Sequence, residues 1–266
     1  MLYIKKMKKL LSIILLATIL FTSCEKIDNA AIIETEGKAT VTFDAVFGTQ
    51  DFALNKDFVS GTKTYNFNKF RYWVSNVTLV NTIGEEYKIP NSYYLIEETA
   101  AVPVQEGAFT YPATKRETIE LTNILAGDYK TIKFSIGVEP KYNDNLSLQI
   151  GELSQLNGMT NISWMWMTSY IFSSIGGKIS ESGTTKNMLI ETGLNANHKS
   201  ASLDLPTTLS IGSNKSTALV ITTDVAKTID GVDVFANPTV GAKQATIMSS
   251  IATNYATKVF TVKSVN

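Results

Sequence analysis

The stretch FNKFRYWVSNVTLV, residues 67–80, decides the fold class of this chain. Large apolar side chains alternate with polar or small ones through most of it, and a period of two residues is typical of a strand. The pattern places Phe70, Tyr72 and Val74 on one face and Arg71 on the other. The stretch therefore predicts a long strand with a buried face.

Similar runs recur on both sides of this strand, separated by turns at residues such as Gly84 and Gly127. Further strands are expected at 39–47, 93–96, 117–121, 129–138, 162–172, 189–192, 201–205, 218–225 and 258–262. Residues 146–156 and 243–255 instead have the 3.6-residue apolar spacing of helices. Many short strands with few helices indicate an all-β fold, an antiparallel β-sandwich with one or two short helices, over residues 38–266.

The N-terminal 23 residues have the composition of a secretory leader. Lysines at positions 5, 6, 8 and 9 precede an apolar run at 10–21, shorter than the ~20 residues that a membrane-spanning helix needs. The sequence LFTSC at 20–24 resembles a bacterial lipobox. We expect a signal peptide at 1–23, acylation of Cys24 and a tether over 24–37. The alternatives are a plain cleaved signal with an incidental Cys, or a short N-terminal anchor helix.

A lipid anchor on Cys24 predicts a membrane-attached protein of the cell envelope, an outer-membrane lipoprotein facing either the periplasm or the cell surface.

The 24 Lys and Arg residues balance 24 Asp and Glu residues, with no basic stripe, and this distribution argues against binding to nucleic acid. The single Cys excludes a disulfide framework and Cys-rich zinc sites within one chain.

The residues needed for acid–base and nucleophilic catalysis are scarce. The chain has one His, His198, in the polar stretch 195–199, which predicts a solvent-exposed loop side chain. No Gly-x-Ser-x-Gly motif is present. Adjacent carboxylates such as Glu97 and Glu98 point to opposite faces of a strand and do not converge on a substrate. The sequence thus predicts a protein that is not an enzyme.

The segment from Met159 to Met167 has the most unusual composition, with two of the three Trp and three of the seven Met of the chain. In a strand, Trp164 and Trp166 would share one face, and Met165 and Met167 the other. Thioethers are soft ligands that select Cu(I). The alternative is a core strand, with aromatic rings packed on one side and Met filling the other.

Collinear blocks of sequence resemble the MbnP-like copper-binding domain family of bacterial, Bacteroidetes-type lipoproteins. The blocks are VTFD at 41–44, FRYWVSNVTL at 70–79 with YYLI at 93–96, GDYKTIKFSIGV at 127–138, and GM at 158–159 with WMWMTSYIF at 164–172. The resemblance covers residues 40–263 and implies an exported β-sandwich concerned with copper acquisition or handling. In some members, a partner dihaem enzyme oxidises a Trp to kynurenine, which helps hold copper beside a His.

The resemblance carries over Trp164 and Trp166 by position. Where the family pattern has His-x-Gly, this chain has Glu191-Thr192-Gly193. The candidate copper ligands are therefore Trp164, Trp166, His198, Met165, Met167 and Glu191, with Met159 as a further thioether. This soft, His-poor set favours Cu(I) over Cu(II). The alternative function is that of a metal-free structural or ligand-binding lipoprotein, which keeps the sandwich and has lost the copper site.

Overall fold

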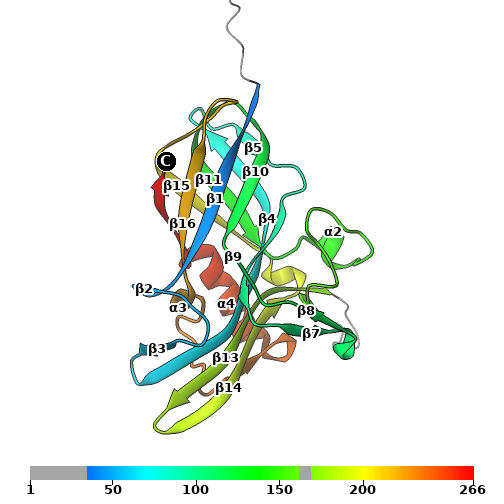
Figure 1. The fold of residues 1–266 in the computed structure, drawn as a ribbon, viewed down its shortest axis with the longest axis vertical. Coiled ribbons are helices and arrows are strands. Elements are labelled where there is room, and N and C mark those ends of the chain that lie inside the picture. The colour runs from blue at the N-terminus through cyan, green and yellow to red at the C-terminus, as the bar shows by residue number, and fades with distance from the viewer. Residues whose placement is uncertain (1–34, 162–168) are drawn as a thin grey trace, which may run out of the picture. The chain divides into compact units, whose positions relative to one another are not determined.

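β-strands dominate the structure, a computed structural model that describes residues 35–161 and 169–266 (Figure 1). Cys24 and the predicted leader lie outside the described residues, as do Trp164, Met165, Trp166 and Met167. In the described ranges, the helices are all too short or too polar to cross a membrane. The prediction of a largely β fold with few helices is confirmed.

The strands are β1 Glu36–Phe47, β2 Gln50–Asp51, β3 Asp57–Ser60, β4 Lys63–Asn81, β5 Glu86–Lys88, β6 Tyr93–Thr99, β7 Val102–Val104, β8 Phe109–Tyr111, β9 Thr114–Arg116, β10 Thr118–Leu125, β11 Gly127–Ile136, β12 Thr160–Asn161, β13 Ser169–Glu181, β14 Thr184–Gly193, β15 Lys199–Ile211, β16 Thr217–Asp224, β17 Thr239–Val240 and β18 Phe260–Val265. The helical elements are α2 Pro140–Asn143, α3 Val225–Thr228, α4 Ala245–Thr257 and the 3-10 turns η1 Gln105–Gly107, η2 Asn195–Asn197 and η3 Ala242–Gln244.

Two sheets contain most of these strands. The smaller has the order β10-β1-β16-β18, and the larger has the order β15-β11-β4-β13-β14-β17 with β6 also paired to β4. The pairs β1–β16 and β14–β17 are parallel. The prediction of an antiparallel sandwich is therefore correct only in part: most strand pairs are antiparallel, and these two parallel pairs make the sheets mixed. Parallel neighbours need a long connection, which the many residues between β1 and β16 provide.

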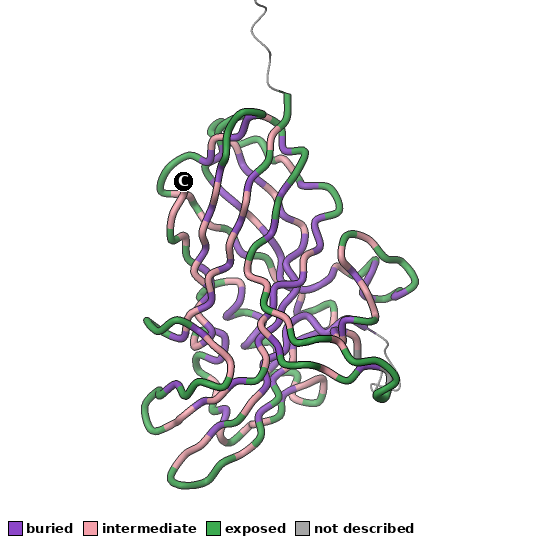
Figure 2. Tube along the Cα trace, in the orientation of Figure 1, coloured by how far each residue is buried: buried purple, intermediate pink, exposed green. Residues whose placement is uncertain are grey.

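The faces predicted from alternation enclose what we call the first core, the buried cluster between the two sheets. Phe43 of β1 packs edge-to-face on Phe134 of β11, with ring centroids 5.5 Å apart, and on Tyr72 of β4. Phe70 and Val74 point into the same cluster. Buried positions alternate with less buried ones along β1, whereas residues 70–75 of β4 are all buried (Figure 2). Since Phe70, Tyr72 and Val74 of β4 face the first core, the alternate side chains of β4, such as Arg71 and Trp73, point to the opposite face of the sheet.

A second core lies on the opposite face of β4. Its buried members are Trp73, Tyr93, Leu95, Val138, Tyr142, Leu146, Leu153, Met159, Tyr170, Ile171 and Phe172. Trp73 packs edge-to-face on Tyr170 at 6.0 Å, and Tyr93 does so on Tyr142 at 5.4 Å. Burial of both faces explains why β4 consists mainly of large side chains.

The helix expected at 146–156 is wrong. These residues form turns, in which the Asn145 side chain accepts hydrogen bonds from Ser147 and Gly151 has φ +57°. Leu146 and Leu153 are buried in the second core, so their spacing reflects packing rather than helical periodicity. The helix expected at 243–255 is confirmed as α4, whose Met248, Ile251 and Tyr255 enter the first core.

Candidate functional site

His198 follows η2 and lies partly buried on the second-core side of the larger sheet. Its ring packs edge-to-face on Phe172 of β13, with centroids 6.2 Å apart. Its Nε2 lies 3.4 Å from the Oγ of Ser75 in β4. The expectation of a solvent-exposed loop side chain is therefore wrong. The turn is held inward because the side chain of Asn197 donates to the carbonyl of Gly193.

The surroundings of His198 favour its neutral form. Burial lowers the pKa of the imidazole from its ordinary value of 6.5, and the negative charge of Glu139 opposes that shift only in part. A neutral imidazole keeps a lone pair available for a metal ion. Ser75 is fully buried, so the Ser75–His198 contact does not present a hydroxyl to a substrate.

Glu191 of β14 lies beside different partners. Its Oε1 accepts a hydrogen bond of 3.1 Å from Ser174 and lies 3.9 Å from the Nζ of Lys69. Burial lowers the pKa of Lys69, while the Glu191 carboxylate raises it. The contacts found among the described residues bring Glu191 to a lysine and a serine rather than to His198. The structure thus does not join these two predicted ligands.

The four remaining ligand candidates, Trp164, Met165, Trp166 and Met167, lie outside the described residues. On either side of them, Thr160 pairs with Tyr170 and Asn161 with Ser169, as β12 against β13. Met159 precedes β12 and is fully buried in the second core. Its thioether serves as packing in this structure, as the alternative interpretation of this segment expects for a Met.

A buried ion pair that sequence reasoning missed supports the start of β12. Arg71 of β4 donates through Nε and Nη2 to Oε2 of Glu97 in β6, at 2.8 and 2.7 Å. Nη2 also donates to the carbonyl of Asn157 at 2.7 Å. The Tyr111 hydroxyl donates to Oε1 of Glu97, and its ring lies 4.9 Å from the guanidinium carbon. The only sequence signal was a charged residue on the second face of β4, opposite Phe70 and Tyr72.

A fit to copper can be tested on the described residues. Residues 35–161 and 169–266 contain no group of three or more His, Cys, Asp or Glu side chains that could hold a metal ion. They provide one neutral imidazole, that of His198. The described residues therefore do not form a copper centre by themselves, and further donors would have to come from the Trp and Met segment.

The model of the MbnP family matches residues 36–249, which is most of the chain. The chain belongs to the MbnP family. The predicted resemblance is thereby confirmed, and the matched range includes His198, Glu191 and the whole Trp and Met segment of this MbnP-family chain.

Among solved structures, MbnP from Methylosinus trichosporium is similar over 74% of this chain and 78% of that one, with 14% identity and a TM-score of 0.47. A similarity this low carries no argument about ligands in this MbnP-family chain. Comparison with curated proteins gives no match.

Proposed function

We propose that this MbnP-family chain is a lipid-anchored protein of the cell envelope that binds and hands on copper as Cu(I), and that it acts by binding rather than by catalysis. Membership of the MbnP family supports the link to copper, because the resemblance to that family implies copper acquisition or handling. The leader and the LFTSC sequence support export and acylation at Cys24. Two or more acyl chains on one Cys give a stable membrane anchor.

The observation that carries the copper proposal is the placement of His198. The imidazole is held neutral by burial and rests on Phe172 of β13, the strand that begins directly after the Trp and Met segment. A metal needs a deprotonated nitrogen, so this environment prepares His198 as a ligand at neutral pH.

The thioethers of the Trp and Met segment account for the preference for Cu(I). Met165 and Met167 with His198 make a soft donor set, which favours Cu(I), and Trp164 and Trp166 offer indole faces to a nearby cation. The role of the protein is to provide these donors, to keep the imidazole deprotonated and to limit access of water. Oxidation of Trp164 or Trp166 by a dihaem partner, as the resemblance implies, would raise the intact mass by the difference between an oxygen and a carbon atom.

A metal-free binding protein is the second candidate. Glu191 stands where the resemblance expects an imidazole, and in this structure it is bonded to Ser174 and lies beside Lys69. A carboxylate neutralised by a lysine is a poor ligand for a soft cation. This observation favours a chain that keeps the fold without the metal.

A Cu(I) titration against a competing chelator separates the two candidates. We expect the full-length protein to take one Cu(I) with a Kd below ~1 μM, equivalent to about −8 kcal/mol. Affinity should fall in His198→Gln and in Met165→Leu/Met167→Leu. It should persist in the control Met159→Leu, because the buried Met159 packs in the second core. No binding tighter than micromolar would overturn the copper proposal and favour the metal-free alternative. Tight binding with equal affinity in all variants would instead show that His198, Met165 and Met167 are not the ligands.

A further inference from the structure

β4 contains a bulge at Asn76, and a pocket opens beside it. Val74 and Val77 both point into the first core, although they are three residues apart, so one extra residue interrupts the period of two. Asn76 is that residue, with φ +53°. Bulges re-aim a side chain out of the pleat and are frequent next to functional sites. Here the bulge turns Asn76 out of the core and into the lining of the pocket.

Hydrogen bonds from the same bulge hold Ser92, another residue of the pocket lining. The amide of Asn76 donates to the carbonyl of Ser92 at 3.0 Å, and the amide of Val77 donates to the Ser92 hydroxyl at 2.9 Å. Asn91, on the rim, also has a left-handed backbone, with φ +55°. The walls are therefore fixed by the backbone of β4 and of the loop before β6, independently of any ligand.

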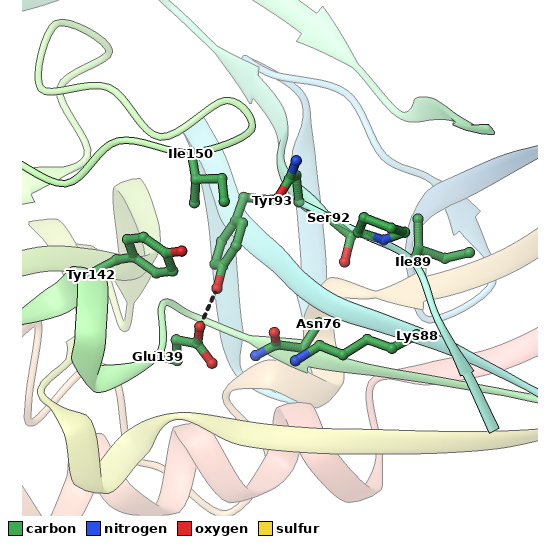
Figure 3. Close-up of a pocket in the computed structure, with 10 residues that line it drawn as sticks. Asn76, Lys88, Ile89, Ser92, Tyr93, Glu139, Tyr142 and Ile150 are labelled. Carbon is green, nitrogen blue, oxygen red and sulfur yellow. Dashed lines mark hydrogen bonds between the residues drawn. The ribbon is translucent and has the colours of Figure 1, made fainter. Parts of the chain in front are cut away.

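Figure 3 shows Asn76 and Lys88 across the pocket from Tyr93 and Ile150, with Glu139 near the Tyr93 hydroxyl. That hydroxyl donates to Oε1 of Glu139 at 2.8 Å, which leaves Oε2 as an acceptor. Among the described residues, no hydrogen bond or ion pair is found for the side chains of Asn76 and Lys88. The pocket thus offers a carboxamide, an ammonium and a carboxylate oxygen that have spare hydrogen-bonding capacity.

Size and charge restrict what the pocket can take. Its volume is about 210 Å³, below the ~300–1,000 Å³ of pockets for drug-sized ligands. Its lining carries one cationic side chain, Lys88, and one anionic side chain, Glu139, so neither sign of charge is favoured. Ile150 and the ring of Tyr142 add apolar wall. A small, neutral ligand with both donors and acceptors and an apolar face meets all these conditions.

We propose that this pocket binds one sugar residue, free or at the end of a glycan, through Asn76, Lys88 and Glu139, with its C–H face against Ile150 and Tyr142. Sugar hydroxyls both donate and accept, so each can pair with the carboxamide, the ammonium and the carboxylate. This site is separate from the proposed Cu(I) ligands, and the inference does not depend on copper binding.

The test is calorimetric titration of the full-length protein in detergent with glucose, galactose, mannose and N-acetylglucosamine, each up to ~10 mM, so that even millimolar affinities are detected. Asn76→Gly removes the carboxamide and keeps a residue that tolerates φ +53°. Asn123→Gly is the matched control, because Asn123 also has a left-handed backbone, with φ +55°, and lies outside the pocket. Lys88→Met tests the ammonium at an exposed position.

We expect at least one of these sugars to bind, with affinity about tenfold weaker in Asn76→Gly and in Lys88→Met and unchanged in Asn123→Gly. Should Asn76→Gly fail to fold, Lys88→Met decides alone. Absence of binding by every sugar would overturn the proposal. So would binding that neither pocket variant weakens, or binding of free glycine, a zwitterion, in place of the sugars.

Discussion

Replacement of Arg71 by Met should destabilise this fold more than any change at a surface charge. Arg71 is 1% exposed and Glu97 is 4% exposed, so the two charges meet in a medium from which water is excluded. Met preserves the apolar length of the side chain and removes the guanidinium. Among the described residues, the Glu97 carboxylate then keeps the side-chain hydrogen bond from the Tyr111 hydroxyl alone, and the carbonyl of Asn157 loses its side-chain donor.

The expected cost follows from what is left unpaired. Removal of one partner of a buried ion pair typically costs ~3–5 kcal/mol, because the other charge stays buried without compensation. A domain of this size has a total stability of about 5–15 kcal/mol, and 1 kcal/mol shifts its Tm by about 2–4 °C. The loss in Arg71→Met therefore corresponds to a Tm lower by about 6–20 °C.

Urea unfolding followed by circular dichroism measures this free energy. The matched control is Lys133→Met, which breaks a pair with Glu86 whose side chains are 41% and 56% exposed. That change should cost less than ~1 kcal/mol. The double variant Arg71→Met/Glu97→Met should be more stable than Arg71→Met alone by at least about 1 kcal/mol, since it removes the stranded charge. Equal stability of Arg71→Met and Lys133→Met would show that the buried pair contributes no more than an exposed one.

Three further predictions concern other parts of the chain. Because burial lowers the pKa of His198, the unfolded chain binds that proton more readily, and the free energy of unfolding should fall as pH drops below about 6.5. His198→Gln should lose this part of the pH dependence, which is at most about 1.4 kcal/mol per pH unit. An identical slope of unfolding free energy against pH in both proteins would contradict the role of His198. Gly137 has φ +108°, and a Cβ there would lie 2.4 Å from Phe172, so Gly137→Ala should cost about 2–5 kcal/mol. In contrast, Gly84→Ala, with no atom within 4 Å of its new Cβ, should cost less, and equal losses by thermal unfolding would be inconsistent with the clash. Cys24→Ser should abolish incorporation of labelled palmitate and release the protein from membranes, whereas retained label would place the anchor elsewhere.

The sequence predicted the elements whose side chains alternate most clearly. The faces of β1 and β4 were correct because burial against one core imposes a period of two on the sequence. The prediction of a helix at 146–156 was wrong because leucines of this segment pack into the second core from turns. Their spacing along the sequence resembles that of a helix although no helix forms. The parallel β1–β16 pair depends on long-range topology, which local periodicity does not contain.

The candidate sites were less accessible to sequence reasoning. Polar neighbours made His198 appear solvent-exposed, whereas Phe172 and Ser75, distant in sequence, cover it. Nothing near Arg71 indicated that Glu97, 26 residues away, would neutralise it. The bulge at Asn76 was also missed, because a left-handed Asn within a strand leaves only a one-residue change of phase between Val74 and Val77.

The X-ray absorption spectrum of the full-length protein loaded with Cu(I) shows which atoms surround the copper. We predict sulfur neighbours from Met165 and Met167 together with a nitrogen neighbour from His198. The nitrogen should disappear in His198→Gln and the sulfur in Met165→Leu/Met167→Leu, while Met159→Leu should leave the spectrum unchanged. Copper surrounded by oxygen and nitrogen alone, or a spectrum insensitive to all three variants, would contradict the proposal that this chain handles copper through these donors.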